Sequence, residues 1–131
     1  MEISKIVIAD DDPNIRKIAK ISLMRLGPWA VEDAASGAEA LRLIEEFEPD
    51  VLLLDVMMPG MDGPSVLREL QSKRNPLDIP VIFMTAKVMR HEVEEYEKMG
   101  AAGTVVKPFS PKDLADQIRM ICATWRAPAA N

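Results

Sequence analysis

The chain alternates short runs of aliphatic and β-branched residues with longer stretches of helical character, five of each. The expected strands cover residues 5–9, 29–34, 51–55, 79–84 and 104–106. Short apolar runs of this kind are typical of strands that are buried on both faces of a parallel sheet. With helices between them and short links throughout, they predict an α/β fold with a doubly wound sheet.

Start and stop signals define two of the expected helices. An Asp-Pro pair at residues 12–13 opens the first helix, and a Gly-Pro pair at residues 27–28 ends it. Ser36 caps the second helix, and Glu39 completes a capping box. The other three helices are expected over about 64–72, 88–99 and 111–124. Six positions of the first helix recur at helical spacing: Ile15, Ile18, Ala19, Ser22, Leu23 and Leu26.

The length of 131 residues fits one domain and leaves no room for two. Hydrophobic residues make up 48% and charged residues 28%, which is the balance of a folded globular protein. We expect the domain over residues 1–124. The Pro- and Ala-rich end, residues 125–131, is expected to be a flexible tail or the start of a linker in a longer chain.

Charge, cysteine content and hydropathy exclude several classes of protein. Sixteen basic and 21 acidic residues give a net charge of −5, whereas direct binding of nucleic acid needs a basic face. The single Cys122 excludes an intramolecular disulfide and a cysteine metal cluster, and we expect it to be a small buried residue. No apolar run approaches a membrane span or a signal peptide, so we expect a cytoplasmic protein that does not bind membranes.

Polar side chains lie where four of the five expected strands end. Three aspartates, residues 10–12, follow the first strand, and Asp55 ends the third. Thr85 follows the fourth strand and Lys107 the fifth. Because ligands of open α/β sheets bind beyond the carboxyl ends of the strands, these side chains mark the candidate site.

The chemistry of this group points to a metal and a phosphoryl group. Two carboxylates ~4 Å apart repel by about 4 kcal/mol at an effective dielectric near 20. A hard divalent cation relieves this repulsion, and oxygen-only ligands suit Mg²⁺ or Mn²⁺. Lys107 can place a positive charge on a phosphoryl group, and Thr85 can donate a hydrogen bond to it. An aspartate in this setting can attack a phosphoryl donor in line, so the residues predict an aspartyl-phosphate site.

Four segments of the chain resemble the receiver domains of two-component response regulators. They are KIVIADDDP, VLLLDVMMPGMDG, VIFMTA and GTVVKPF, in the order and spacing of that family. The resemblance covers Lys5 to about Ala123, and four linked motifs are far more specific than one short pattern. It implies a flavodoxin-like (βα)5 fold, with a five-stranded parallel sheet and five helices. The implied function is a phosphoacceptor signalling domain that assists its own phosphorylation and dephosphorylation, and not an enzyme.

The resemblance also implies an acceptor and a set of metal ligands. Asp55 would take a phosphoryl group from a histidine kinase or a histidine phosphotransfer protein. Asp11 and Asp55 would ligate Mg²⁺ directly, together with the backbone carbonyl of Met57. Asp10 would act mostly through a metal-bound water, whereas Asp12 is expected to cap the first helix.

Further roles follow from the same resemblance. Lys107 would pair with the acceptor and then with its phosphoryl group, and Thr85 would swing toward that group. The switch position, often aromatic in this family, is Thr104 here, and it is too small to fill the space that Thr85 vacates. We therefore expect activation to move the last two strand–helix units without a rotating ring. Met57 and Lys87 flank the path of attacking water and are expected to set the phosphoryl lifetime.

Two other functions on related sheets are disfavoured. A haloacid-dehalogenase-like phosphatase wants a second aspartate two residues after the nucleophile, where this chain has Met57. A flavodoxin-like electron carrier binds the FMN phosphate in its first loop, and the aspartates at residues 10–12 would repel that phosphate. His91 lies among glutamates and is expected to be a surface residue, not a phosphohistidine.

Three settings for the domain stay open. It can be a stand-alone regulator, a phosphorelay intermediate, or the receiver part of a longer hybrid kinase or output-domain regulator. In each setting, the surface of the last two strand–helix units is the expected face for a downstream protein partner.

Overall fold

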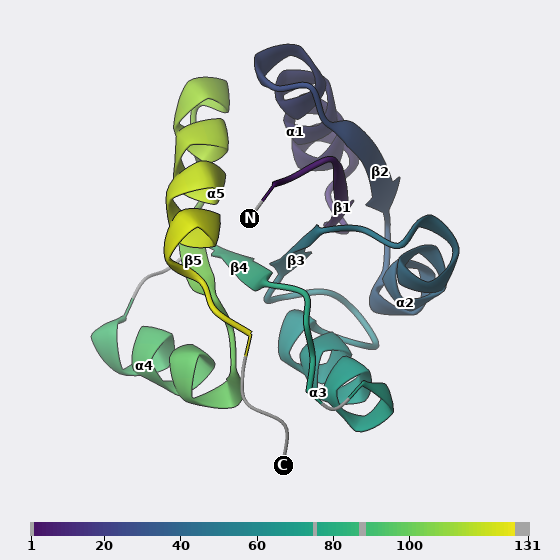
Figure 1. Cartoon of the computed structure of the whole chain (residues 1–131), viewed down its shortest axis with the longest axis vertical. Helices are drawn as coiled ribbons and strands as arrows, with labels where there is room; N and C mark the ends of the chain where they lie inside the picture. The colour runs from purple at the N-terminus through teal and green to yellow at the C-terminus, as the bar shows by residue number, and fades with distance from the viewer. Residues whose placement is uncertain (1, 75, 87–88, 128–131) are drawn as a thin grey trace.

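The structure, a computed structural model that describes residues 2–74, 76–86 and 89–127, has a five-stranded parallel sheet with helices on both faces (Figure 1). The strands are β1 Lys5–Ala9, β2 Ala30–Ala34, β3 Val51–Asp55, β4 Val81–Thr85 and β5 Gly103–Val106. The helices are α1 Pro13–Leu26, α2 Gly37–Phe47, α3 Gly63–Lys73, α4 Arg90–Met99 and α5 Pro111–Thr124. The strand order is β2-β1-β3-β4-β5, which confirms the predicted doubly wound α/β fold.

Each face of the sheet has its own hydrophobic core. On one face, Leu23 of α1 and Ile118 of α5 pack into a cluster that includes Leu53 of β3. On the other face, Ile44 of α2 belongs to a second cluster that includes Leu54 of β3. Figure 1 shows the same division, with α1 and α5 on one side of the sheet and α2, α3 and α4 on the other. Alternate residues of the central strands therefore enter opposite cores, which explains why these strands are apolar throughout.

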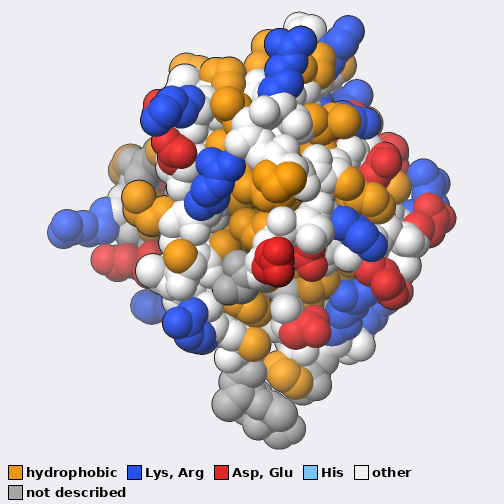
Figure 2. All heavy atoms as spheres, turned by 45° about the horizontal axis from the view of Figure 1, so that its top comes forward, with side chains coloured by type: hydrophobic (Ala, Val, Ile, Leu, Met, Phe, Trp, Pro, Cys, Tyr) orange, Lys and Arg blue, Asp and Glu red, His pale blue; other side chains and the backbone are white. Residues whose placement is uncertain are grey.

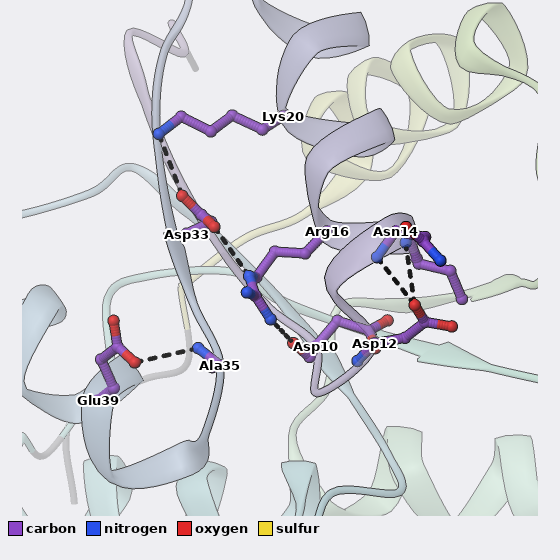
Figure 3. Close-up of polar contacts among 9 residues, drawn as sticks. Asp10, Asp12, Asn14, Arg16, Lys20, Asp33, Ala35 and Glu39 are labelled. Atoms are coloured by element: carbon purple, nitrogen blue, oxygen red, sulfur yellow. Dashed lines mark hydrogen bonds and ion pairs between the residues drawn. The ribbon is translucent and has the colours of Figure 1, made fainter.

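The start of α2 differs in one detail from the predicted capping box. The Ser36 side chain accepts a hydrogen bond from the Glu39 N–H at 3.2 Å, as expected for a cap. The Glu39 carboxylate accepts from the N–H of Ala35, also at 3.2 Å, and not from that of Ser36 (Figure 3). The return bond thus reaches one residue before the cap.

Some boundaries are shifted from their predicted positions. β4 covers Val81–Thr85 and not residues 79–84, because Pro80 has no N–H to donate to the ladder. β2 begins at Ala30, one residue later than predicted, and β5 begins at Gly103, one residue earlier. Helix α4 begins at Arg90, and its predicted start at Val88 lies outside the described residues.

Helix α5 ends where the sequence predicts, at Thr124. The next N–H, that of Trp125, donates to the carbonyl of Ile121 at 3.1 Å and closes the helix. Of the tail expected over 125–131, residues 128–131 lie outside the described part of the chain. Within the described ranges, no helix combines the length and the hydropathy that a membrane crossing requires.

Cys122 lies on the sheet-facing side of α5, in the same core cluster as Leu114 and Ile118. It is buried, as predicted for a small apolar residue. Burial raises the pKa of its thiol to about 11. The thiol is therefore neutral throughout the physiological range of pH.

We predict that Cys122 reacts slowly with thiol reagents in the folded protein. With a pKa of about 11, roughly one thiol in a thousand is ionised at pH 8, and the thiolate is the reactive form. Alkylation by iodoacetamide at pH 8, followed by mass spectrometry, is expected to be at least ~100-fold slower in native buffer than in urea. Similar rates in the two solutions would contradict the buried placement.

Candidate functional site

The ends of neighbouring strands bring polar side chains to one edge of the sheet. Asp10 directly follows β1, Asp55 is the last residue of β3, and Thr85 is the last residue of β4. Lys107 directly follows β5. The strand order reverses between β1 and β3, and this switch point is where open α/β sheets bind ligands.

Lys107 lies between the two buried carboxylates of this edge. Its Nζ is 3.1 Å from Asp10 Oδ2 and 3.2 Å from Asp55 Oδ1. Asp10 is fully buried, and Asp55 is 3% exposed. Asp11 is exposed, yet carboxylate oxygens of Asp10, Asp11 and Asp55 all lie within 4.8 Å of one another. The lysine is thus shared by two members of a cluster of three acids.

The surroundings of the cluster disfavour the negative charge of Asp55 and favour the positive charge of Lys107. The pKa of Asp55 is raised to about 6, first by burial and second by the charge of Asp10, although Lys107 acts in the opposite direction. Burial acts to lower the pKa of Lys107, but the hydrogen bonds and charges of Asp10 and Asp55 outweigh it, and that pKa is raised. A cation bound beside Asp55 would favour its carboxylate form.

The donor set of the cluster fits a hard divalent cation. The grouped atoms of Asp10, Asp11 and Asp55 are carboxylate oxygens, the ligands that Mg²⁺ and Mn²⁺ prefer. Mg²⁺ usually keeps several waters and needs only one or two carboxylates, and Asp11 supplies an exposed one. The three carboxylates that the sequence predicts at a metal site therefore lie together, and their chemistry suits the metal.

The loop after β1 connects the acid cluster to helix α1. Asp10 Oδ1 accepts a hydrogen bond from the N–H of Asp12 at 2.9 Å. Asp12 Oδ1 in turn accepts from the N–H groups of Asn14, at 2.9 Å, and Ile15, at 3.4 Å (Figure 3). The prediction that Asp12 caps the first helix is confirmed.

Sequence reasoning missed a second set of contacts at this loop. Arg16 Nη1 donates to the backbone carbonyl of Asp10 at 2.8 Å, and Arg16 Nε donates to Asp33 Oδ2 at 2.8 Å (Figure 3). Lys20 Nζ donates to the other oxygen of Asp33 at 3.1 Å. The sequence feature that could have predicted these contacts is a pair of basic residues four apart on one helix face, Arg16 and Lys20, followed by the acidic Asp33 in the next strand.

The loop after β3 has one exposed methionine and two packed ones, as predicted. Met57 is 78% exposed, and its N–H donates to Asp55 Oδ1 at 3.2 Å. Met58 is buried, and Met61 packs against the same core cluster. Helix α3 begins close to the end of β3: a Cβ at Gly63 would lie 2.6 Å from the carbonyl oxygen of Asp55. Only glycine allows this approach.

Thr104, the residue expected at the switch position, lies beside an aromatic pair. Thr104 pairs in register with Phe83 on β4, and Phe83 packs edge-on against Tyr96 of α4 with ring centroids 5.0 Å apart. In the described part of the chain, the buried hydroxyl oxygen of Thr104 has no hydrogen-bond partner. Thr85 is buried, and Lys87 lies outside the described residues.

An apolar groove of about 390 Å³ adjoins the site. Its lining residues are Ile15, Ile18, Ala86, Lys107, Pro108 and Phe109. Ile18 is 57% exposed, although it recurs at helical spacing with buried residues of α1. Figure 2 shows hydrophobic side chains exposed across the centre of one face, with basic and acidic side chains interspersed around them.

His91 is exposed, as predicted.

Two curated relatives of this chain are named as probable transcriptional regulators. The probable transcriptional regulator ycf27 of Guillardia theta is 41% identical over 117 residues, which are 89% of this chain and 44% of the relative. The probable transcriptional regulator ycf27 of Cyanophora paradoxa is 42% identical over 133 residues, covering 100% of this chain and 54% of the relative. The chain thus spans about half the length of these curated relatives.

Two solved structures match this chain over nearly their whole length. The Vibrio cholerae chemotaxis protein CheY4 is 29% identical with a TM-score of 0.84, covering 92% of this chain and 99% of that one. The receiver domain of the Francisella response regulator 1452 is 31% identical with a TM-score of 0.81, covering 90% and 95%. The family model for the response regulator receiver domain matches residues 6–119. With its fold and its acidic edge, the chain therefore belongs to the response regulator receiver domain family.

Proposed function

We propose that this receiver domain is phosphorylated on Asp55. One observation carries the proposal: Asp55 ends a central strand, is almost fully buried, and lies 3.2 Å from Lys107 Nζ beside two further carboxylates. A buried acid with a raised pKa and a cationic partner is typical of a reactive group. Family membership supports the same role.

In the proposed reaction, a carboxylate oxygen of Asp55 attacks the phosphorus of a phosphohistidine on a histidine kinase or a histidine phosphotransfer protein. A P–O bond to Asp55 forms, the P–N bond breaks, and the imidazole leaves after taking up a proton. Lys107 is in reach of Asp55 and supplies a positive charge for the phosphoryl oxygens. Thr85 ends the neighbouring strand, and we assign it a hydrogen bond to the same group.

The proposed metal ligands are Asp11 and Asp55, with the backbone carbonyl of Met57, while Asp10 acts through a water. When bound, Mg²⁺ would neutralise negative charge on the transferred phosphoryl group. Mn²⁺ meets the same requirement for oxygen donors. In this proposal the domain is itself the phosphoacceptor and does not act as an enzyme on a separate substrate.

The setting of the domain is a second part of the proposal. Because the chain spans about half of relatives named as transcriptional regulators, we favour a receiver that works with an output domain over a relay intermediate. The net charge of −5 gives no support to direct binding of nucleic acid by these residues. Since the phosphodonor is a histidine kinase or phosphotransfer protein, we place the reaction in the cytoplasm.

Two surfaces are available to protein partners. The apolar groove beside Lys107 offers a phosphodonor protein a contact surface next to the acceptor. The surface of the last two strand–helix units, β4–α4 and β5–α5, is the proposed surface for a downstream partner. Charge on such a surface selects among protein partners. The charged side chains of helix α4 are mixed but mostly acidic: Arg90, Glu92, Glu94, Glu95, Glu97 and Lys98.

The acceptor assignment predicts that Asp55→Asn abolishes labelling by ³²P-acetyl phosphate in the presence of Mg²⁺, because the amide cannot form the acyl phosphate. Asp12→Asn is the matched control, since asparagine caps a helix as well as aspartate does and Asp12 lies outside the proposed ligand set. The control is expected to be labelled at the wild-type level. Full labelling of Asp55→Asn would show that the acceptor is another residue.

The exposed position of Met57 predicts an effect on the phosphoryl lifetime. Met57→Asn places a polar side chain beside the acceptor, where it can orient an attacking water, and is expected to shorten the phosphoryl half-life severalfold. Mg²⁺ affinity is expected to stay nearly unchanged, because only the backbone of Met57 belongs to the ligand set. Met57→Leu is the control, and an unchanged half-life in the asparagine variant would count against the proposal.

The packing around Thr104 predicts activation without a ring rotating at this position. In a structure with the phosphoryl analogue beryllium trifluoride, we expect Thr85 to move toward the analogue and α4 to shift with Tyr96 relative to Phe83. Crystallography of the two forms under the same conditions measures both displacements. The idea is wrong if Thr85 and α4 occupy the same positions in both.

A further inference from the structure

Arg16 holds the metal-site loop at two points. Its side-chain Nη1 donates to the backbone carbonyl of Asp10 at 2.8 Å, and its backbone N–H donates to the carbonyl of Asp12 at 3.0 Å. Both ends of the three-aspartate loop are therefore tied to one residue. The side chain is mostly buried, with 19% exposed, so these bonds compete little with water.

The contact with the Asp10 carbonyl also constrains Asp11. The carbonyl of Asp10 and the N–H of Asp11 belong to one planar peptide unit. Fixing the direction of that carbonyl therefore limits the backbone rotation that aims the Asp11 side chain. Asp11 is the exposed member of the acid cluster and has no surrounding core to fix it.

Asp33 on β2 keeps Arg16 in this orientation. Arg16 Nε donates to Asp33 Oδ2 at 2.8 Å, and Lys20 Nζ donates to Asp33 Oδ1 at 3.1 Å (Figure 3). Burial alone would raise the pKa of Asp33, but the hydrogen bonds and charges of Lys20 and Arg16 outweigh it and lower that pKa. Asp33 is thus a carboxylate at neutral pH. The planar guanidinium reaches Asp33 and Asp10 at once, which a lysine ammonium at position 16 would not do with the same geometry.

We propose that Arg16 is a positioning residue for Mg²⁺: through the Asp10 carbonyl it sets the direction of Asp11, and Asp33 holds it in place. The inference rests on the proposed function, because it assumes that Asp11 is a metal ligand. Groups that orient metal ligands without touching the metal commonly change metal affinity by roughly 10- to 100-fold.

Lys20 offers a matched control for this role. Lys20 and Arg16 lie one turn apart on α1, and both pair with Asp33. Only Arg16 also contacts Asp10. Arg16→Gln and Lys20→Gln each remove one positive charge and one ion pair with Asp33, so they differ in the link to the metal-site loop.

The test is the Mg²⁺ dissociation constant of the whole chain, measured by titration calorimetry at fixed ionic strength for wild type, Arg16→Gln, Arg16→Lys and Lys20→Gln. We expect Mg²⁺ to bind roughly tenfold or more weakly to both Arg16 variants. Lys20→Gln is expected to bind within about twofold of wild type, or slightly more tightly. Loss of positive charge alone would tighten Mg²⁺ binding in Arg16→Gln, so the positioning role and a simple charge effect have opposite signs.

Urea unfolding of the metal-free proteins separates positioning from general damage to the fold. We expect Lys20→Gln and Arg16→Lys to lose similar amounts of stability, while only the Arg16 variant loses Mg²⁺ affinity. If Arg16→Gln does not fold, Arg16→Lys decides alone, because it keeps the charge and removes the simultaneous side-chain contact with Asp33 and the Asp10 carbonyl.

Three results would overturn the inference. If the wild type binds Mg²⁺ and the Arg16 variants bind it equally or more tightly, Arg16 has no positioning role, and the proposed function still stands. The same follows from an equal loss of affinity in Lys20→Gln. Failure of the wild-type chain to bind Mg²⁺ overturns the proposed metal site itself, and the positioning role with it.

Discussion

Repulsion among the carboxylates of Asp10, Asp11 and Asp55 is the constraint on which the rest of this site depends. Two such groups ~4 Å apart cost about 4 kcal/mol at an effective dielectric near 20, and burial of two of them adds to that cost. Lys107 offsets part of it from the end of β5. Hydrogen bonds from the N–H groups of Asp12 and Met57 to these carboxylates offset a further part of the cost. The apolar sheet beneath provides a rigid support that keeps the like charges together.

The position of this site was accessible from the sequence, because the change from apolar to charged residues marks where a buried strand ends. At Asp10, Asp55 and Lys107 that change coincides with the strand end in the structure or lies one residue from it. Since adjacent parallel strands end at the same edge, three local signals predict one site. Thr85 was placed just after its strand and is its last residue, because it pairs in register with Val106 of β5 and its carbonyl accepts a hydrogen bond from the N–H of Lys107.

The sequence held less information on contacts that depend on how elements dock. Periodicity showed that Ile18 and Leu23 are at repeating positions of α1, but it does not show how wide a surface covers the helix. Leu23 is buried and Ile18 is not. The contact of Arg16 with the Asp10 carbonyl depends on a backbone acceptor, which no residue type reveals. The aromatic pair of Phe83 and Tyr96 beside Thr104 likewise depends on where α4 lies on the sheet.

Among the described residues, helix α4 has no fully buried one, and its N-cap residue Met89 makes no side-chain capping bond. It is held by the edge-on contact of Tyr96 with Phe83, and at its end by a bond from the Gln71 side chain to the Met99 carbonyl at 2.6 Å. The other four helices each bury at least three residues in the core. Sequence change in α4 is therefore limited less by core packing than change in the other four helices. With α4 as part of the proposed partner surface, a lineage of such proteins can acquire a new binding partner by changing this helix while the acidic site and the fold stay as they are.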